Sequence, residues 1–264
     1  MTAGSVLSLP HLVAFAAAFV AGAINSVAGG GTLLTFPVLI WIGLPSITAN
    51  ATSTVAIWPG SLGSVWGYRR ELRGVHPITY VLTVPSVVGG VIGAVLLQRT
   101  PTHVFDRLVP MLILFATCLF MLQEPVQRMI GSGGLALHAR SRRWVVGAVL
   151  FQLLVALYGG YFGAGIGILM LAALGILGYT EIHQMNGLKT LFALFINGIA
   201  ALYFVVMGMV HWPEALVMAI GAIVGGYAGA GVARRIGAKG VRRVVILVGF
   251  AMALSLLVKL KPHG

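Results

Sequence analysis

The sequence predicts an all-α polytopic membrane protein built from two inverted repeats. Of its 264 residues, 59% are hydrophobic and 8% are charged, and the mean hydropathy is +1.00. A soluble domain carries roughly 25% charged residues, so most of this surface must face lipid. Apolar runs of about 20 residues recur along the chain, each long enough to cross a bilayer as a helix. Two glycine-rich breaks at matching places indicate the repeat.

Each predicted half is a hairpin of two half-helices followed by three full transmembrane helices. The first hairpin is interrupted by NSVAGGG (residues 25–31) and the second by GGYFGAGIG (159–167). The predicted segments are 11–24, 32–43, 46–66, 78–97 and 104–122, then 144–158, 168–178, 183–208, 215–233 and 244–260. This pattern gives eight spans if each hairpin is merged and ten segments if it is not. Residues 1–122 form the first repeat, 123–143 a cytoplasmic linker that contains GSGG, and 144–264 the second repeat.

The two halves align without gaps when the chain is shifted by 136 residues. The shift pairs residues that are unusual in apolar segments: Gly29 with Gly165, Gly31 with Gly167, Asn50 with Asn186, Thr54 with Thr190, and Ser61 with Asn197. Equivalent loops differ in charge, since YRRELRGVHP has three arginines where MVHWPE has no Lys or Arg. Likewise, QRTPTH has one arginine where RRIGAKGVRR has five basic residues. Because basic loops stay in the cytoplasm, equivalent loops should lie on opposite sides, which makes the second repeat inverted.

The same charge distribution predicts the topology and the partners. The net charge of +12 lies in short loops between apolar runs, as membrane topology requires, so it does not indicate a nucleic-acid partner. With the basic loops inside, both termini are predicted to be periplasmic. The lipid bilayer is the expected surrounding of the chain.

The glycine-rich breaks predict a binding site. Each glycine costs about 1 kcal/mol of helix stability relative to alanine, and a membrane tolerates broken backbone only around a cavity or inside protein. Inverted repeats with interrupted helices occur in secondary transporters, and a helix N-terminus attracts an anion. The alternative is close helix packing through small residues, which we expect of isolated glycines such as Gly89 and Gly225.

The segment after each hairpin carries polar residues at helical spacing. They are Asn50, Ser53, Thr54 and Ser61 in the first half, and Asn186, Lys189, Thr190 and Asn197 in the second. A lysine inside a membrane is costly and is a functional-site hypothesis by default, with an anion as its natural partner. Two ordinary explanations stay open. Ser and Thr often bond within their own helix, and Lys189 lies near enough to a helix start to snorkel to the surface.

The positions of the acidic residues also favour a negatively charged substrate. All five are expected in loops or at helix ends: Glu71, Asp106, Glu124, Glu181 and Glu214. Cation carriers and many proton-coupled carriers use buried carboxylates, so this distribution favours an anion. Proton or ion coupling through Glu181 and His183 stays open, and a solvated helix start explains both residues equally well.

Motifs for catalysis or metal binding are missing from the sequence. There is no HExxH, no GxSxG and no P-loop lysine pattern, and GAGIG lacks the strand and the acidic residue of a dinucleotide fingerprint. Cys118 is the only cysteine, so the chain has neither an internal disulfide nor a cysteine-based metal site. We therefore expect no enzyme activity, no cofactor and no metal.

The stretch AGAINSVAGGGTLLTFPVLIWIGLPSITANATS resembles the TauE/SafE family of membrane transporters, often called sulfite exporters. The stretch GGYFGAGIGILMLAALGILGYTEIHQMNGLKT is similar to the family's second copy of that motif. The resemblance implies a bacterial inner-membrane protein that moves sulfite, sulfonates such as sulfoacetate, or related small anions. It places the signature regions at 25–31 with 50–54, and at 159–167 with 186–190. Lys189 stands where many members carry a small polar residue, which favours a divalent or strongly acidic anion.

Together these observations predict a secondary transporter that moves a small anion by alternating access. An anion channel of the same fold is one alternative, and an intramembrane enzyme or non-transporting helper subunit is another. Saturable counter-transport would exclude the channel, and turnover without flux would indicate the enzyme. Direction and oligomeric state are not predicted. The predicted substrate-binding residues are Asn25, Ser26, Gly29, Gly30, Gly31, Asn50, Ser53, Thr54, Gly163, Gly165, Gly167, Asn186, Lys189, Thr190 and Asn197.

Overall fold

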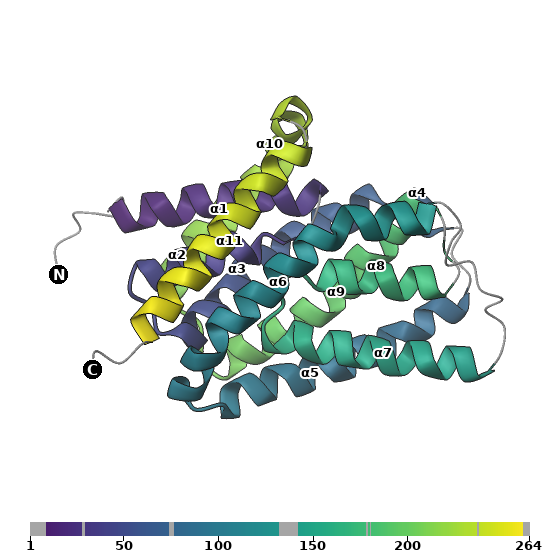
Figure 1. Ribbon diagram of the computed structural model, residues 1–264, viewed down its shortest axis with the longest axis horizontal. Helices are drawn as coiled ribbons and strands as arrows, with labels where there is room; N and C mark the ends of the chain where they lie inside the picture. Colours follow the sequence, from purple (N-terminus) through teal and green to yellow (C-terminus); the bar gives the residue numbers. More distant parts are fainter. Residues whose placement is uncertain are drawn as a thin grey trace.

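The computed structural model describes residues 9–27, 30–73, 77–131, 142–177, 179, 181–236 and 238–260, and every regular element in these ranges is helical (Figure 1). The predicted all-α class is therefore confirmed for the described chain. The helices are α1 Leu9–Val27, α2 Thr32–Trp41, α3 Ser46–Gly67, α4 Arg69–Leu72, the 3-10 helix η1 Pro77–Leu82, α5 Thr83–Arg99, α6 Thr102–Gly131, α7 Arg142–Tyr161, α8 Ile166–Ile176, α9 Ile182–Val206, α10 Trp212–Ile236 and α11 Ala238–Leu260.

Both predicted glycine breaks separate two helices. The helix after each break is short: α2 has 10 residues and α8 has 11, so each rises only about 15 Å. The helix before each break is longer than predicted, with 19 residues in α1 and 20 in α7, or about 30 Å. The expectation of two half-helices per hairpin is thus wrong for the first member. Helix α1 continues to Val27, and α7 continues through Gly159 and Gly160 to Tyr161.

The outer surface is apolar along whole helices. Three described helical segments are long and apolar enough to cross a membrane: Tyr80–Arg99, Thr102–Leu122 and His183–Val206. On α5, side chains four residues apart are each at least 45% exposed, which makes a continuous outward stripe of Val84, Val88, Ile92 and Leu96. A soluble monomer rarely exposes such a face, whereas a lipid-facing helix requires it.

Helices of the two predicted halves pack against each other at glycine residues. Helix α1 of the first half packs on α10 of the second half, and α7 of the second half packs on α5 of the first. A Cβ on Gly225 would lie 1.9 Å from the Phe19 carbonyl oxygen, and one on Gly89 would lie 2.7 Å from that of Leu153. The expectation that Gly89 and Gly225 serve helix packing is therefore confirmed. Small residues allow this backbone contact in membrane helices.

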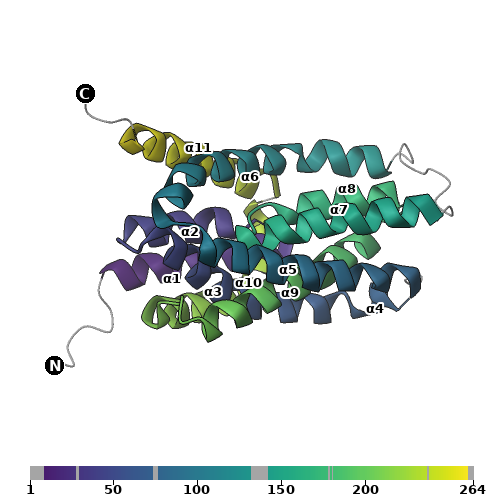
Figure 2. The ribbon, with the colours of Figure 1, turned by 90° about the horizontal axis from the view of Figure 1, so that it is seen from below.

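The remaining packing places α3 against α9 and α6 against α11. In both ribbon views the start of α1 and the end of α11 lie at one end of the bundle, while α4 lies at the other (Figures 1 and 2). Helix α6 continues to Gly131, so part of the stretch expected as a linker is helical. Residues 132–141 lie outside the described chain, and the division into domains stays a prediction.

We expect Gly225→Ala to destabilise the protein because its methyl group would collide with the backbone of α1. Overpacking of this kind costs about 1–3 kcal/mol. Gly147 on α7 has no atom within 4 Å of a built Cβ, so Gly147→Ala should be neutral or stabilising by about 0.5–1 kcal/mol. Thermal unfolding of both purified variants in detergent measures the difference. Equal melting temperatures would contradict the packing role of Gly225.

Candidate functional site

A cavity of about 1150 Å³ is lined by residues of both halves, including both glycine breaks. The first half contributes Gly30 and Thr32 at its break and the C-terminal part of α3. The second half contributes the break before α8 and the N-terminal half of α9. The predicted meeting of the two breaks at one place is therefore visible as a shared cavity wall.

At the first break, glycine geometry and one side chain hold the turn. Gly30 has a φ of +98°, which side-chain-bearing residues rarely adopt, and a Cβ there would lie 2.7 Å from the Phe120 ring. The Asn25 Oδ1 atom accepts a hydrogen bond from the Gly31 N–H at 2.8 Å. Helix α2 then begins at Thr32 with no side-chain cap. The start of α2 thus faces the cavity with its positive dipole end uncapped.

The second break is built on the same principle with different residues. Gly165 has a φ of +78° and precedes α8, whose N-terminus also has no side-chain cap. The Tyr158 hydroxyl donates a hydrogen bond to the Ala164 carbonyl at 2.8 Å, which satisfies an acceptor of the loop. Gly165, Ile166 and Gly167 all line the cavity. Two uncapped helix N-termini therefore contribute to one cavity wall.

Lys189 lines this cavity and is only 8% exposed. Its aliphatic stem lies along Gly167, because a Cβ built there would be 3.1 Å from the Lys189 Cδ. Among the described residues, no carboxylate lies within ion-pairing distance of its ammonium group. A buried cation without an ionic partner is unfavourable, and an anion bound beside it would offset that cost.

The predicted site residues fall into three groups: those that line the cavity, those that do not, and two that are not described. The cavity is lined by Asn25, Gly30, Gly163, Gly165, Gly167, Lys189, Thr190 and Asn197. Gly31, Asn50, Ser53, Thr54 and Asn186 are not among its lining residues. Gly29 and the side chain of Ser26 lie outside the described part of the chain.

Three of the residues away from the cavity form hydrogen bonds with other residues of the fold. The Asn50 Nδ2 donates to the Tyr161 carbonyl at 2.9 Å, and this bond links α3 to the end of α7. The hydroxyls of Ser53 and Thr35 share a hydrogen bond of 2.6 Å between α3 and α2. The Thr54 hydroxyl donates to the Asn50 carbonyl at 2.9 Å, so it bonds within its own helix.

The cavity wall also includes polar residues that sequence reasoning left out of the site. They are Ser64, Tyr68 and Glu71, which follow Ser61 at helical spacing along α3 and into α4. This spacing continues the predicted polar stripe and was the available signal. Glu71 lies on the four-residue helix α4, and one of its carboxylate oxygens is buried without a hydrogen-bond partner.

Glu181 and His183 fit the explanation of a solvated helix start. Both side chains are exposed, and the Glu181 carboxylate accepts hydrogen bonds from the backbone N–H groups of His183 and Gln184. Slight burial opposes ionisation of Glu181, but these bonds and the charge of His183 outweigh it and lower the pKa of the carboxyl group. Glu181 therefore serves as the N-cap of α9.

A helical membrane protein with paired broken helices around a polar cavity has the architecture of a membrane transporter. The chain belongs to the sulfite exporter TauE/SafE family, whose sequence profile matches residues 14–256. It is 29% identical over 254 residues to a probable membrane transporter protein, ORF9, of Sinorhizobium, covering 94% of this chain and 93% of that one.

Other relatives carry similar descriptions. A probable membrane transporter protein of Haemophilus influenzae is 30% identical over 258 residues, covering 92% of this chain and 93% of the relative. The probable membrane transporter protein YfcA of Escherichia coli is 28% identical over 251 residues, covering 93% and 88%. No solved structure matches the chain significantly. The family and its relatives support membrane transport as the function.

We expect Ser53→Ala to reduce stability while transport per folded molecule stays unchanged. The substitution removes the partner of the buried Thr35 hydroxyl, which costs about 1–3 kcal/mol. Thermal unfolding in detergent, together with flux normalised to the folded fraction, separates the two effects. A specific loss of flux with unchanged melting temperature would instead assign Ser53 to the binding site.

Proposed function

We propose that this protein is a secondary transporter that moves a small anion by alternating access. Sulfite, a sulfonate such as sulfoacetate, or a related sulfur oxyanion is the proposed substrate. The observation that carries the proposal is the convergence of Lys189 and two uncapped helix N-termini on one cavity. All three favour negative charge.

The neutral groups around the cavity suit an oxyanion. Asn25 and Asn197 line the wall together with Lys189, and side-chain amides donate hydrogen bonds to sulfonate or sulfite oxygens. Thr190 also lines the wall, but its hydroxyl donates to the Asn186 carbonyl at 2.8 Å. The cavity volume of about 1150 Å³ exceeds that of a small anion, so the substrate can enter with part of its water. Arg69, Arg70 and Arg73 are exposed beside the Glu71 end of the wall and attract anions towards it.

Packing directions support the inverted repeat. Trp58 contacts Leu194 and Gly198, and the later residue Tyr68 contacts the earlier residue Gly187, so the equivalent helices α3 and α9 run antiparallel. An inverted repeat requires this direction, because its two-fold axis lies in the membrane plane. The equivalent pairs α1–α10 and α7–α5 pack alike. Rocking of these equivalent units around a fixed site is the usual route to alternating access.

The topology proposed with this mechanism places the basic loops in the cytoplasm and both termini in the periplasm of a bacterial inner membrane. The Tyr68 and Glu71 end of the cavity then lies at the cytoplasmic side. The domain division into residues 1–122, 123–143 and 144–264 belongs to the same proposal.

Lys189→Met should reduce anion uptake by tenfold or more, because a charged hydrogen-bond partner contributes about 1.5–3 kcal/mol. The assay is uptake of labelled sulfite, sulfoacetate and thiosulfate, with a carboxylate control, by purified protein in liposomes. Lys189→Arg should retain more uptake than Lys189→Met. Arg99→Gln, at the exposed end of α5, is the matched control and should behave like the wild type. Uptake of none of these anions by folded protein would overturn the proposed substrate class.

Ser64→Cys tests the orientation of the cavity in a Cys118→Ala background. We expect a membrane-impermeant thiol reagent to label this cysteine only from the cytoplasmic side, and bound substrate to slow the labelling. Thr102→Cys, an exposed position at the start of α6, is the control and should be labelled from the other side. Labelling of both positions from one side would contradict the proposed topology.

A further inference from the structure

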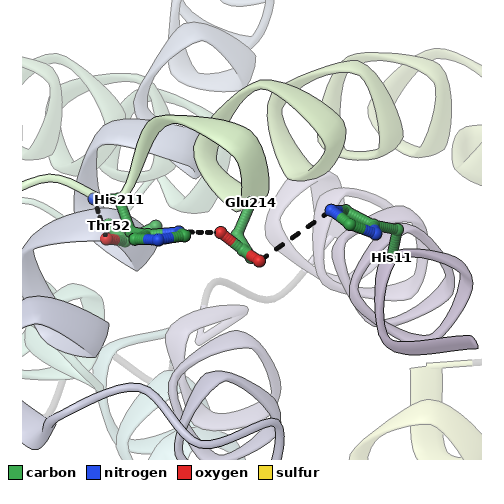
Figure 3. Close-up of polar contacts among 4 residues, drawn as sticks. All are labelled: His11, Thr52, His211 and Glu214. Atoms are coloured by element: carbon green, nitrogen blue, oxygen red, sulfur yellow. Dashed lines mark hydrogen bonds and ion pairs between the residues drawn. The ribbon is translucent and has the colours of Figure 1, made fainter. Parts of the chain in front are cut away.

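A second polar cluster lies far from the cavity, where α10 begins. The Glu214 carboxylate lies between two histidines: one oxygen contacts the His211 Nδ1, and the other lies 3.9 Å from the His11 Nε2 (Figure 3). Glu214 lies in the first turn of α10, at a helix end as predicted, and is only 8% exposed. The swapped packing of α1 on α10 buries it, and that contact brings His11 from a distant part of the chain.

The cluster lies towards the end of the bundle that holds the start of α1 (Figures 1 and 2). Glu214 precedes the first cavity-lining residue of α10, Ala222, by eight residues or about 12 Å of helix. His11 precedes Gly22 on α1 by eleven residues, or about 16 Å. The charge distribution assigns this end to the periplasm, opposite to the arginines of α4.

The contacts of the cluster join three helices. His11 belongs to α1 and Glu214 to α10, while the His211 backbone N–H donates to the Thr52 hydroxyl on α3 at 2.9 Å. Thr52 is fully buried, and its neighbour Ser53 binds Thr35 on the half-length helix α2. The cluster is therefore connected to the first hairpin by two hydrogen bonds and the intervening backbone of α3.

We propose that Glu214, with His11 and His211, forms a proton-binding site that couples proton entry to anion transport. This inference rests on the proposed transport function. Each histidine pairs with Glu214 as an ion only when its imidazole carries a proton, and imidazole titrates near physiological pH. Protonation of the carboxylate removes the ion pair between the start of α1 and the start of α10.

The helices that pack against α10 contribute few other ionisable side chains. Three helices pack against α10: α1 has no ionisable side chain except His11, and α3 has none. On α11 the described ionisable side chain is Arg243, near the start of that helix and hence at the opposite end of α10. Two imidazoles favour a proton over Na⁺, which prefers oxygen ligands. Within the described residues, no group of three His, Cys, Asp or Glu could hold a metal ion.

The test compares anion exchange with proton-driven uptake in liposomes that contain a trapped pH-sensitive dye. The probe is labelled sulfoacetate, or whichever anion of the panel the wild type carries. An acidic outside should accelerate wild-type uptake about tenfold, within the usual range of coupling between sites, and the dye should report proton entry. Glu214→Gln should exchange anion at equal pH like the wild type, but lose both the acceleration and the proton signal. Asp106→Asn, at the same end of the bundle and bonded to Ser46, should keep both.

An acceleration by the proton gradient that survives Glu214→Gln would overturn the proton site while leaving transport intact. Failure of the proposed function is distinct, because the wild type would then exchange no anion at equal pH, and the coupling inference would fall with it. If Glu214→Gln does not elute as a folded protein, the double variant His11→Gln, His211→Gln replaces it. That variant keeps the carboxylate and should shift the pH profile of uptake, whereas an unchanged profile would overturn the proposal.

Discussion

The need to satisfy backbone groups at the two helix breaks governs much of this structure. Lipid offers no hydrogen bonds, so a broken helix in a membrane needs partners from the protein or from cavity water. Asn25 binds the N–H of Gly31 within the first break, and Tyr158 binds the carbonyl of Ala164 within the second. Asn50 reaches across from the first half to the Tyr161 carbonyl at the end of α7. Neither α2 nor α8 has a side-chain N-cap, and residues at both helix starts line the cavity.

Close helix contacts at glycines bring the two breaks to the wall of one cavity. Because α1 packs on α10 and α7 on α5 at backbone distance, neither half can withdraw from the other without exposing its own helix face. Gly90 and Gly160 show how close this approach is, since a Cβ on Gly160 would lie 2.2 Å from the Gly90 carbonyl oxygen. On the proposed mechanism, motion between the halves would then be sliding or rotation along these parallel contacts. A cavity between such units can change its opening while its walls stay in place.

The sequence alone identifies the features that destabilise any transmembrane helix. The glycine breaks and Lys189 fall in this class, since each is unfavourable in a plain transmembrane helix. It could not decide which side of α3 faces the cavity, because that depends on the rotation of the helix against its neighbours. The structure turns Ser53 and Asn50 towards the hairpins and the later stripe beginning at Ser61 towards the cavity. The burial of Glu214 was equally out of reach, because it results from the exchange of helices between the halves.

The two halves differ at the position of Lys189, the buried charge of the cavity wall. The 136-residue shift that aligns the repeats places Lys189 on Ser53 and Gly167 on Gly31. In the first half the Ser53 hydroxyl is satisfied by Thr35, whereas in the second the Lys189 ammonium has no ionic partner among the described residues. Closing the cavity around the lysine alone would bury an unpaired charge, while closing it around an anion would bury a pair, which costs far less. On the proposed mechanism, the loaded transporter therefore changes its orientation more readily than the empty one, which is the condition for coupled exchange.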